Sequence, residues 1–413
     1  MNQDHVNPNI IQLLDKGVKI PNPDSVEIGE EVKIDRISGE DVTLHSGCKI
    51  YGASTLILQG AKIGHQGPVT IDNCQLGPEV ELHGGYFKES VFLKKSSMQT
   101  GAHVREGTIL EEQANGAHTV GLKQTVLFPF VTLGSLINFC DCLMAGGTDR
   151  RNHSEVGSSY IHFNFTPNQD KATPSLLGDV PRGVMLDKPP IFLGGQGGIV
   201  GPSRLEYGTV TAAGTIVRRD VLTPGQLIFG EGGKGGNIPY AADVYSNIQR
   251  VFTNNIIYIA NLVALMRWYE NVRSMFISKD FPEPLYNGLT QRLAQAVEER
   301  IKRLSSYCNA QDKADESPGK KSTLQKQKKE LYEHWPEAED QIHYNIDFQG
   351  NLQYRDNFLS ILQNEIQSNR KDYIKTVQGL NKEVKNIGTQ WLQGIVDDMQ
   401  RDVFGKLSTI KTQ

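Results

Sequence analysis

The sequence lacks the features that identify several common classes of protein. Its five cysteines are too few, and odd in number, for a disulfide framework, which suits a reducing compartment. Cys140 and Cys142 are separated by one residue, whereas zinc sites prefer two to four intervening residues, so we interpret them as small apolar residues. The remaining cysteines are Cys48, Cys74 and Cys308.

An excess of charge of one sign is also missing. The 43 basic residues nearly balance the 47 acidic ones, which leaves no bias toward nucleic acid or an acidic membrane. The most apolar long stretch, Ile256 to Met266, is interrupted by Asn261 and is too short to span a bilayer. The first residues have neither the basic start nor the apolar core of a secretory signal. We expect a cytoplasmic protein that binds neither nucleic acid nor membranes.

Glycine, by contrast, is abundant, with 41 residues that lie mainly before residue 240. In the same region apolar residues recur six apart, a spacing that fits neither the 3.6 period of a helix nor the alternation of a strand. Hexapeptide repeats of this kind are typical of a parallel β-helix, whose short faces each bury one apolar residue. Examples are Leu44, Ile50 and Leu56, then Ile57, Ile63 and Val69, and later Leu193, Ile199 and Leu205. We predict a mainly β fold over residues 25–240, after an N-terminal extension of residues 1–24.

The pattern changes near residue 241. Glycine becomes rare and apolar residues take helical spacing, which predicts an α-helical appendage over residues 241–413. Within it, the charged stretch 309–328 is interpreted as an exposed linker. Helices are expected over residues 248–266, 284–307, 352–368, 372–386 and 389–407.

The run IFLGGQGGIVGPSRLEYGTVTAAGTIVRRDV, residues 191–221, carries a family resemblance. It is similar, without a gap, to the acetyltransferase domain of the bifunctional enzyme that acetylates glucosamine 1-phosphate and then uridylylates it. That domain is a left-handed parallel β-helix of the hexapeptide acyltransferase superfamily. Upstream matches are Val156-Gly157-Ser158-Ser159, Asn164-Phe165 with Lys171, and Arg105-Glu106-Gly107 with Lys123. The resemblance covers residues 100–225.

The resemblance implies a function and a set of site residues. It implies transfer of an acetyl group from acetyl-CoA to an amino sugar phosphate or a nucleotide sugar of the UDP-N-acetylglucosamine type. It also implies a homotrimer with sites between adjacent β-helices. Arg105, Lys123, Asn164 and Lys171 would hold the substrate, and Ser158, Gly195 and Ala213 would line the path of the coenzyme. A solvated loop over residues 162–175, and plain coil packing at Gly195 and Ala213, explain the same residues without a ligand.

The sequence departs from the family at the general base. Phe139 stands where the family has its histidine, which leaves His153, His162 and Asp141 as candidate catalytic residues. About ten residues, from Pro181 to Pro190, are inserted before the ungapped run. The family's nucleotidyltransferase half has no counterpart in residues 1–24, so we expect no uridylyl transfer.

A metal site was considered as an alternative. Trimeric β-helix carbonic anhydrases bind zinc through three histidines, and His65 and His83 are spaced by about one coil, so they should stack. The family's third histidine, five residues after the second, is absent, and we expect no metal. Other histidines of the region are His45, His103 and His118. Two hypotheses remain: an acetyl-CoA-dependent N-acyltransferase, and a non-catalytic sugar-nucleotide-binding or scaffold protein that has lost the catalytic histidine.

Overall fold

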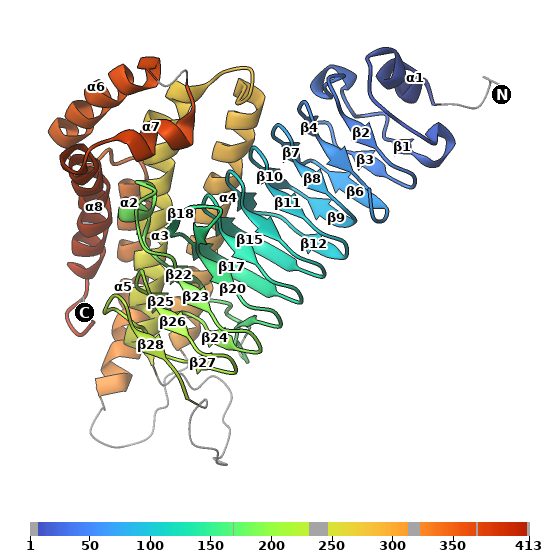
Figure 1. The fold of residues 1–413 in the computed structure, drawn as a ribbon. Helices are drawn as coiled ribbons and strands as arrows, with labels where there is room; N and C mark the ends of the chain where they lie inside the picture. Colours follow the sequence, from blue (N-terminus) through green and yellow to red (C-terminus); the bar gives the residue numbers. More distant parts are fainter. Residues whose placement is uncertain (1–6, 168, 231–246, 313–322, 369–370, 411–413) are drawn as a thin grey trace.

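The protein is a left-handed parallel β-helix with a layer of α-helices along one side (Figure 1). This arrangement comes from a computed structural model that describes residues 7–167, 169–230, 247–312, 323–368 and 371–410. The predicted fold class is confirmed: the described strands precede residue 230, and the long helices follow residue 247.

Three strand faces build the β-helix, and parallel pairing joins each strand to the next coil. The first face contains β1 (Glu27–Ile28), β3 (Lys49–Tyr51), β6 (Val69–Asp72), β9 (Gly85–Lys88), β12 (Ala102–Val104), the first halves of β15 (Gly121–Leu127) and β17 (Asn138–Met144), β21 (Ile161–Phe163), β24 (Gly198–Val200) and β27 (Ile216–Val217). The second contains β4 (Leu56–Ile57), β7 (Gln75–Leu76), β10 (Ser90–Phe92), β13 (Thr108–Leu110), the second halves of β15 and β17, β22 (Ser175–Leu177) and β25 (Arg204–Leu205). The third contains β2 (Thr43–Leu44), β5 (Lys62–Ile63), β8 (Glu81–Leu82), β11 (Ser97–Met98), β14 (Asn115–Gly116), β16 (Thr132–Leu133), β20 (Glu155–Val156), β23 (Phe192–Leu193), β26 (Val210–Thr211) and β28 (Leu227–Ile228).

The six-residue spacing places one apolar side chain of most strands inside the coil. On the first face Ile28, Ile50 and Ile71 stand in register in successive coils, and all three are buried. Because neighbouring coils repeat the same inward position, these side chains stack into a continuous core. The apolar positions of the hexapeptide pattern therefore line the interior of the β-helix, as predicted.

Two short helices, α1 and α2, complete the described fold. Helix α1 (Pro8–Asp15) buries Ile10 and Leu13 at the N-terminal end of the β-helix, where Asn7 Nδ2 donates to the carbonyl of Ile28 (3.0 Å). The predicted insertion before the ungapped run contains α2 (Val180–Gly183), whose N-cap Asp179 accepts from the Arg182 N–H. The 3₁₀ turns are η2 (Pro23–Ser25), η3 (Ile34–Arg36), η4 (Arg273–Phe276) and η5 (Ala310–Asp312).

The long helices agree in part with the predicted ranges. They are α3 (Ile248–Asn271), α4 (Glu283–Asn309), α5 (Thr323–Ile346), α6 (Leu352–Ser368), α7 (Tyr373–Gly379) and α8 (Lys382–Phe404). Helix α5 was not predicted, and its start overlaps the end of the expected linker, of which residues 313–322 lie outside the described residues. Leu331, Trp335, Ala338 and Ile342 are its buried apolar face, a helical spacing that the surrounding charges obscured. No helix in the described part of the chain is long and apolar enough to cross a membrane.

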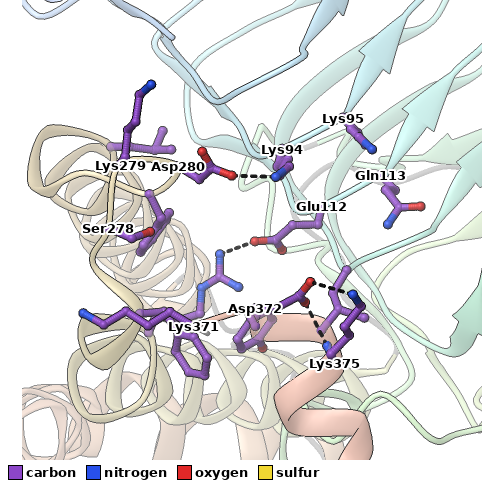
Figure 2. Close-up of a pocket in the computed structure, with 16 residues that line it drawn as sticks. Lys94, Lys95, Glu112, Gln113, Ser278, Lys279, Asp280, Lys371, Asp372 and Lys375 are labelled. Atoms are coloured by element: carbon purple, nitrogen blue, oxygen red, sulfur yellow. Dashed lines mark hydrogen bonds and ion pairs between the residues drawn. The ribbon is translucent and has the colours of Figure 1, made fainter. Parts of the chain in front are cut away.

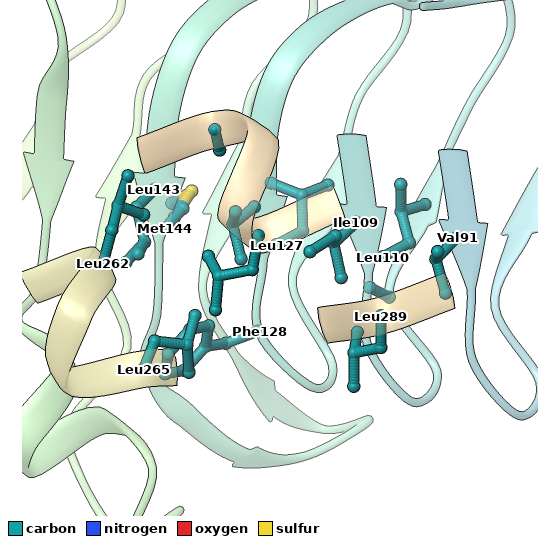
Figure 3. Close-up of a cluster of buried hydrophobic side chains, with 14 of the residues drawn as sticks. Val91, Ile109, Leu110, Leu127, Phe128, Leu143, Met144, Leu262, Leu265 and Leu289 are labelled. Carbon is teal, nitrogen blue, oxygen red and sulfur yellow. The ribbon is translucent and has the colours of Figure 1, made fainter. Parts of the chain in front are cut away.

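The helices cover the second face of the β-helix, and α3 and α4 lie directly against it (Figures 1 and 3). On this face the outward positions are apolar as well: Val91, Ile109, Val126, Leu143 and Leu176 follow one another in register, and all are buried. Figure 3 shows Leu262 and Leu265 of α3 and Leu289 of α4 at this contact. Burial of both sides of these strands makes the helical layer part of the same hydrophobic core.

Polar residues of the apolar helix α3 fix it to the β-helix. The Asn261 Oδ1 accepts from the Val180 N–H of α2 (2.9 Å), and the Asn255 Nδ2 donates to the carbonyl of Ala172 (3.0 Å). Both asparagines are buried, so these bonds satisfy groups that would otherwise be costly to bury. Helix α4 approaches the coils closely at Gly288, where a Cβ atom would lie 2.6 Å from the Gln75 Oε1.

Candidate functional site

The first face of the β-helix has a cleft on its outer side. Its volume is about 430 Å³, and its lining includes His103, Arg105, Asn138, Cys140 and Ile161. His103, Gly121 and Asn138 stand in register in three successive coils. Because Gly121 has no side chain, the row of outward-facing side chains has a gap at the middle of these three coils.

Arg105 and Lys123, both predicted to hold substrate, lie at the edge of this cleft where the first face turns into the second. Arg105 is exposed and lines the cleft, and Lys123 is in register with Cys140, another lining residue. Lys123 forms an ion pair with Glu106 (Nζ–Oε1 2.6 Å). Two cations on neighbouring coils give this edge the charge that an anionic group requires.

Asp141 and Asn164 meet at the same edge, behind the wall of the cleft. The Asn164 Nδ2 donates to the Asp141 Oδ2 (3.3 Å), and the Arg300 of α4 pairs with the Asp141 Oδ1 (2.8 Å). Asp141 adopts a left-handed backbone conformation, with φ of 60°. Burial raises the pKa of the Asp141 carboxyl, and the neighbouring Arg300 guanidinium opposes that rise. The helical layer thus reaches the predicted site through Arg300.

His162 points into the β-helix. It is in register with the core residue Ile199, and its Nε2 lies 2.8 Å from the Ser175 Oγ. Burial lowers the pKa of His162 to about 4, which keeps the imidazole neutral at physiological pH. Phe139 also points inward and is fully buried. Neither ring reaches the outer cleft directly.

Two predicted residues lie elsewhere. His153 belongs to the hairpin of β18 (Gly147–Asp149) and β19 (Asn152–His153), at the corner between the second and third faces, and its Nε2 lies 3.8 Å from the Glu155 Oε2. Lys171 is exposed on the connection from β21 to β22, with φ 57°. The structure therefore brings together Arg105, Lys123, Asp141, Asn164 and His162, but separates His153 from them.

The residues predicted to line the coenzyme path share one corner, between the third and first faces. Ser158, Gly195 and Ala213 occupy successive coils there: a Cβ on Gly195 would lie 2.9 Å from the Ser158 carbonyl oxygen, and one on Gly194 would lie 2.5 Å from the Ala213 nitrogen. Glycine is thus required at this corner by the close approach of the coils. The corner and the Arg105–Lys123 edge bound the first face on its two sides.

His65 and His83 lie next to each other on neighbouring coils, as predicted, with their rings edge to face and centroids 6.1 Å apart, and His45 continues the row at 5.3 Å from His65. Among the residues that the structure describes, no group of three or more histidine, cysteine, aspartate or glutamate side chains has the geometry to hold a metal ion. All five cysteines are free thiols, and Cys140 is the only one that is not fully buried.

Comparison with curated proteins finds relatives that carry one name, bifunctional protein GlmU. The relative from Pelobacter propionicus is 28% identical over 210 residues, which cover 51% of this chain and 40% of the relative. The relative from Thermotoga petrophila is 26% identical over 213 residues, 51% of this chain and 42% of the relative. The β-helix is a hexapeptide-repeat domain that resembles the acetyltransferase domain of GlmU. No family model matches the sequence.

The similarity to GlmU is partial. The chain spans about two fifths of the length of these relatives, and about half of the chain itself is matched. The similarity is therefore one between the β-helix and a part of these relatives.

Sequence analysis missed two residues at this site. His103 lies in the cleft, where its ring stacks on that of Tyr86 with centroids 5.2 Å apart. His103 is two residues before Arg105 in the sequence. Residues two apart on a strand point to the same side, so this spacing could have placed the two side chains on one face. Arg300 had no comparable signal, because its contact with Asp141 joins segments far apart in the sequence.

Proposed function

We propose that the protein transfers an acetyl group from acetyl-CoA to the amine of an amino sugar phosphate or nucleotide sugar, in the cleft of the first face. The observation that carries this proposal is the arrangement of that face. One border of the first face carries the predicted substrate cations, Arg105 and Lys123. The opposite border carries the predicted coenzyme residues, Ser158, Gly195 and Ala213. The helical layer lies on the second face.

The residues suit the two halves of such a substrate. Arg105 and Lys123 supply positive charge for a phosphate, and Arg105 can offer it two parallel N–H donors. Asn164 is held by Asp141, whose ion pair with Arg300 fixes the carboxylate, so the amide is oriented before substrate arrives. The Asn164 Oδ1 is buried beside the His162 ring, so Asn164 supports the cleft from behind its wall.

The proposed reaction requires a proton acceptor. The amine nitrogen attacks the thioester carbonyl, the carbon–sulfur bond breaks, and the coenzyme leaves as a thiol that takes up the proton removed from the amine. We assign proton removal to His103, because its imidazole is exposed in the cleft beside Arg105, while His162 points inward and His153 lies at another corner. Asp141 and His162 would not take part in proton transfer, but would fix the position of the Asn164 side chain at the edge of the cleft.

By analogy with GlmU we further propose a homotrimer in the cytoplasm, with the cleft of one chain completed by its neighbour. Size-exclusion chromatography with light scattering tests this assembly separately from activity.

A second function, binding of a sugar nucleotide without turnover, is favoured by one observation. Phe139, at the position of the family's histidine, is fully buried and points inward, so that position supplies no base to the cleft. Under this alternative the protein binds the same ligands but releases no coenzyme.

Two measurements on the full chain separate these functions. The first is calorimetric binding of acetyl-CoA, glucosamine 1-phosphate and UDP-N-acetylglucosamine, and the second is release of free thiol from acetyl-CoA in the presence of an amino sugar phosphate. Thiol release that falls about 100-fold or more in His103→Gln, with binding kept, supports acetyl transfer and its base. Binding without thiol release supports the second function, and no binding of any of these ligands contradicts both.

Variants at the other predicted residues complete the test. Arg105→Gln is expected to weaken binding of the sugar phosphate about tenfold, because it removes charged hydrogen bonds. Lys62→Gln on the third face, whose side chain is 57% exposed, is the control and should leave both measurements unchanged. A larger loss of turnover in His153→Gln than in His103→Gln would move the base to His153 and overturn our assignment.

A further inference from the structure

A second cavity, of about 680 Å³, lies between the β-helix and the helical layer, away from the first face (Figure 2). The β-helix contributes Lys94 and Lys95 from one coil and Glu112 and Gln113 from the next. The helical region contributes residues 273–285, at η4 and the start of α4, and residues 371–375, at the start of α7. Figure 2 shows these groups facing one another across the cavity.

The lining carries more positive than negative charge. Six cationic side chains face three acidic ones: Lys94, Lys95, Arg273, Lys279, Lys371 and Lys375 against Glu112, Asp280 and Asp372. Two of these lysines also pair with carboxylates outside the lining, Lys95 with Glu79 (3.5 Å) and Lys279 with Glu40 (2.7 Å). These are exposed pairs, which are weak and leave their lysines available to a ligand.

Arg273 is the unusual member of the lining. Its side chain is only 1% exposed, and its guanidinium lies 3.8 Å from the centroid of the Tyr373 ring and 4.7 Å from that of Phe281. Its Nη2 pairs with the Glu112 Oε1 at 2.5 Å. The Nε and Nη1 atoms are buried and have no hydrogen-bond partner in the part of the chain that the structure describes.

Buried donors of a charged group are costly to leave without acceptors. Two aromatic rings hold this guanidinium in place, so its free N–H groups keep a fixed orientation at the cavity. A planar guanidinium with free donors, surrounded by several lysines, is the arrangement that binds phosphate oxygens. The rings of Phe281 and Tyr373 add an apolar wall for the rest of a small ligand.

We propose that this cavity binds a small phosphorylated molecule, at a site separate from the acetyl-transfer cleft. Phosphate oxygens would accept from Arg273 and from lysines of both parts of the molecule, with Lys95 on the β-helix and Lys371 before α7. Because the site needs both parts, ligand binding would hold the helical layer against the coils and raise the stability of the whole chain.

The test measures binding of pyrophosphate and inorganic phosphate to the full chain by calorimetry and by thermal melting. We expect pyrophosphate to bind and to raise the melting temperature. The double variant Lys95→Gln/Lys371→Gln should weaken its binding at least tenfold, because it removes two charged hydrogen-bond donors. The matched control is Lys49→Gln/Lys62→Gln, which removes the same charge from exposed lysines of the β-helix.

Further variants separate this site from the first-face cleft. Arg105→Gln should leave pyrophosphate binding unchanged, and Arg273→Lys, which keeps the charge but loses the planar donors, should weaken it. The proposal is wrong if pyrophosphate does not bind at millimolar concentration, if the control double variant loses as much affinity as the cavity variant, or if Arg105→Gln abolishes binding. These results do not depend on whether the protein transfers acetyl groups.

Discussion

Arg300 and Asp141 form a buried ion pair between the helical layer and the β-helix, with the Arg300 Nη2 2.8 Å from the Asp141 Oδ1 and side chains only 3% and 8% exposed. Asp141 also accepts from Asn164, a predicted substrate residue. Helix α4 therefore determines the orientation of a group at the candidate site, although it lies outside the segment that resembles GlmU.

Removing one partner of this pair should strongly destabilise the protein. Arg300→Ala leaves the Asp141 carboxylate buried without its counter-charge, which costs about 3–5 kcal/mol of unfolding free energy. Denaturant unfolding measures this loss. Arg303→Ala is the control, because Arg303 lies on the same helix, is 24% exposed and pairs with Glu299 within the helix; its effect should stay below about 1 kcal/mol. Equal losses in the two variants would contradict a special role for the buried pair.

Outward-facing apolar side chains on the second face should contribute more to the free energy of unfolding than outward-facing side chains on the first face. Leu143→Ala creates a cavity under the helices and should cost about 2–5 kcal/mol. Asn138→Ala, on the same strand β17 but exposed on the first face, should change the unfolding free energy by less than about 0.5 kcal/mol. Limited proteolysis provides a second measurement, since loosened helices are cut faster. A small loss in Leu143→Ala would mean that the helical layer contributes little to the core.

Stability should depend on pH through Glu111. Burial raises its pKa to about 7, against the opposing charge of Arg273, and its Oε1 accepts from the Tyr269 hydroxyl at 2.5 Å. Between about pH 4.5 and 7 the folded protein then binds more protons than the unfolded chain, so this residue lowers stability as pH rises through that window. Glu111→Gln, which can keep the hydrogen bond, should remove this slope. An unchanged pH profile of the melting temperature would show that Glu111 stays ionised.

His162 should act in the opposite direction. Its pKa of about 4 lies below that of an exposed histidine, so between about pH 6.5 and 4 the unfolded chain binds more protons. Stability contributed by the neutral buried ring is therefore lost as pH falls through this window, by about 1–3 kcal/mol. NMR titration of the His162 ring measures its pKa directly. A pKa of His162 near 6.5, the ordinary value of an exposed histidine, would contradict the burial of its ring.

The hexapeptide period predicted the β-helix because inward residues such as Leu193, Ile199 and Leu205 repeat six apart along the chain. The covered face had a signal that was not used: in Val91-Phe92, Ile109-Leu110 and Leu143-Met144 an apolar outward residue precedes the inward one. Which helices cover that face was beyond the sequence, since the contacts of Leu262 and Leu289 are set by packing between distant segments.

The candidate site was predictable to the extent that its residues lie on neighbouring coils. The family resemblance named Arg105 and Lys123, and the repeat explains why they lie together, since residues one coil apart are neighbours in any β-helix. The orientation of His162 was harder to predict. Side chains along a strand alternate between inward and outward, and polar side chains normally face solvent, but His162 is a polar residue at an inward position. The Arg273 cavity was not predictable, because its walls come from both parts of the chain.

The covered second face restricts how any other molecule can lie along the coils. A three-sided prism normally offers three flat sides, and here the chain's own helices occupy one of them. The third face presents Phe192, Val210 and Leu227 in register, with 41%, 37% and 61% of each exposed. The first and third sides are therefore the faces of the coils that the described helices leave uncovered.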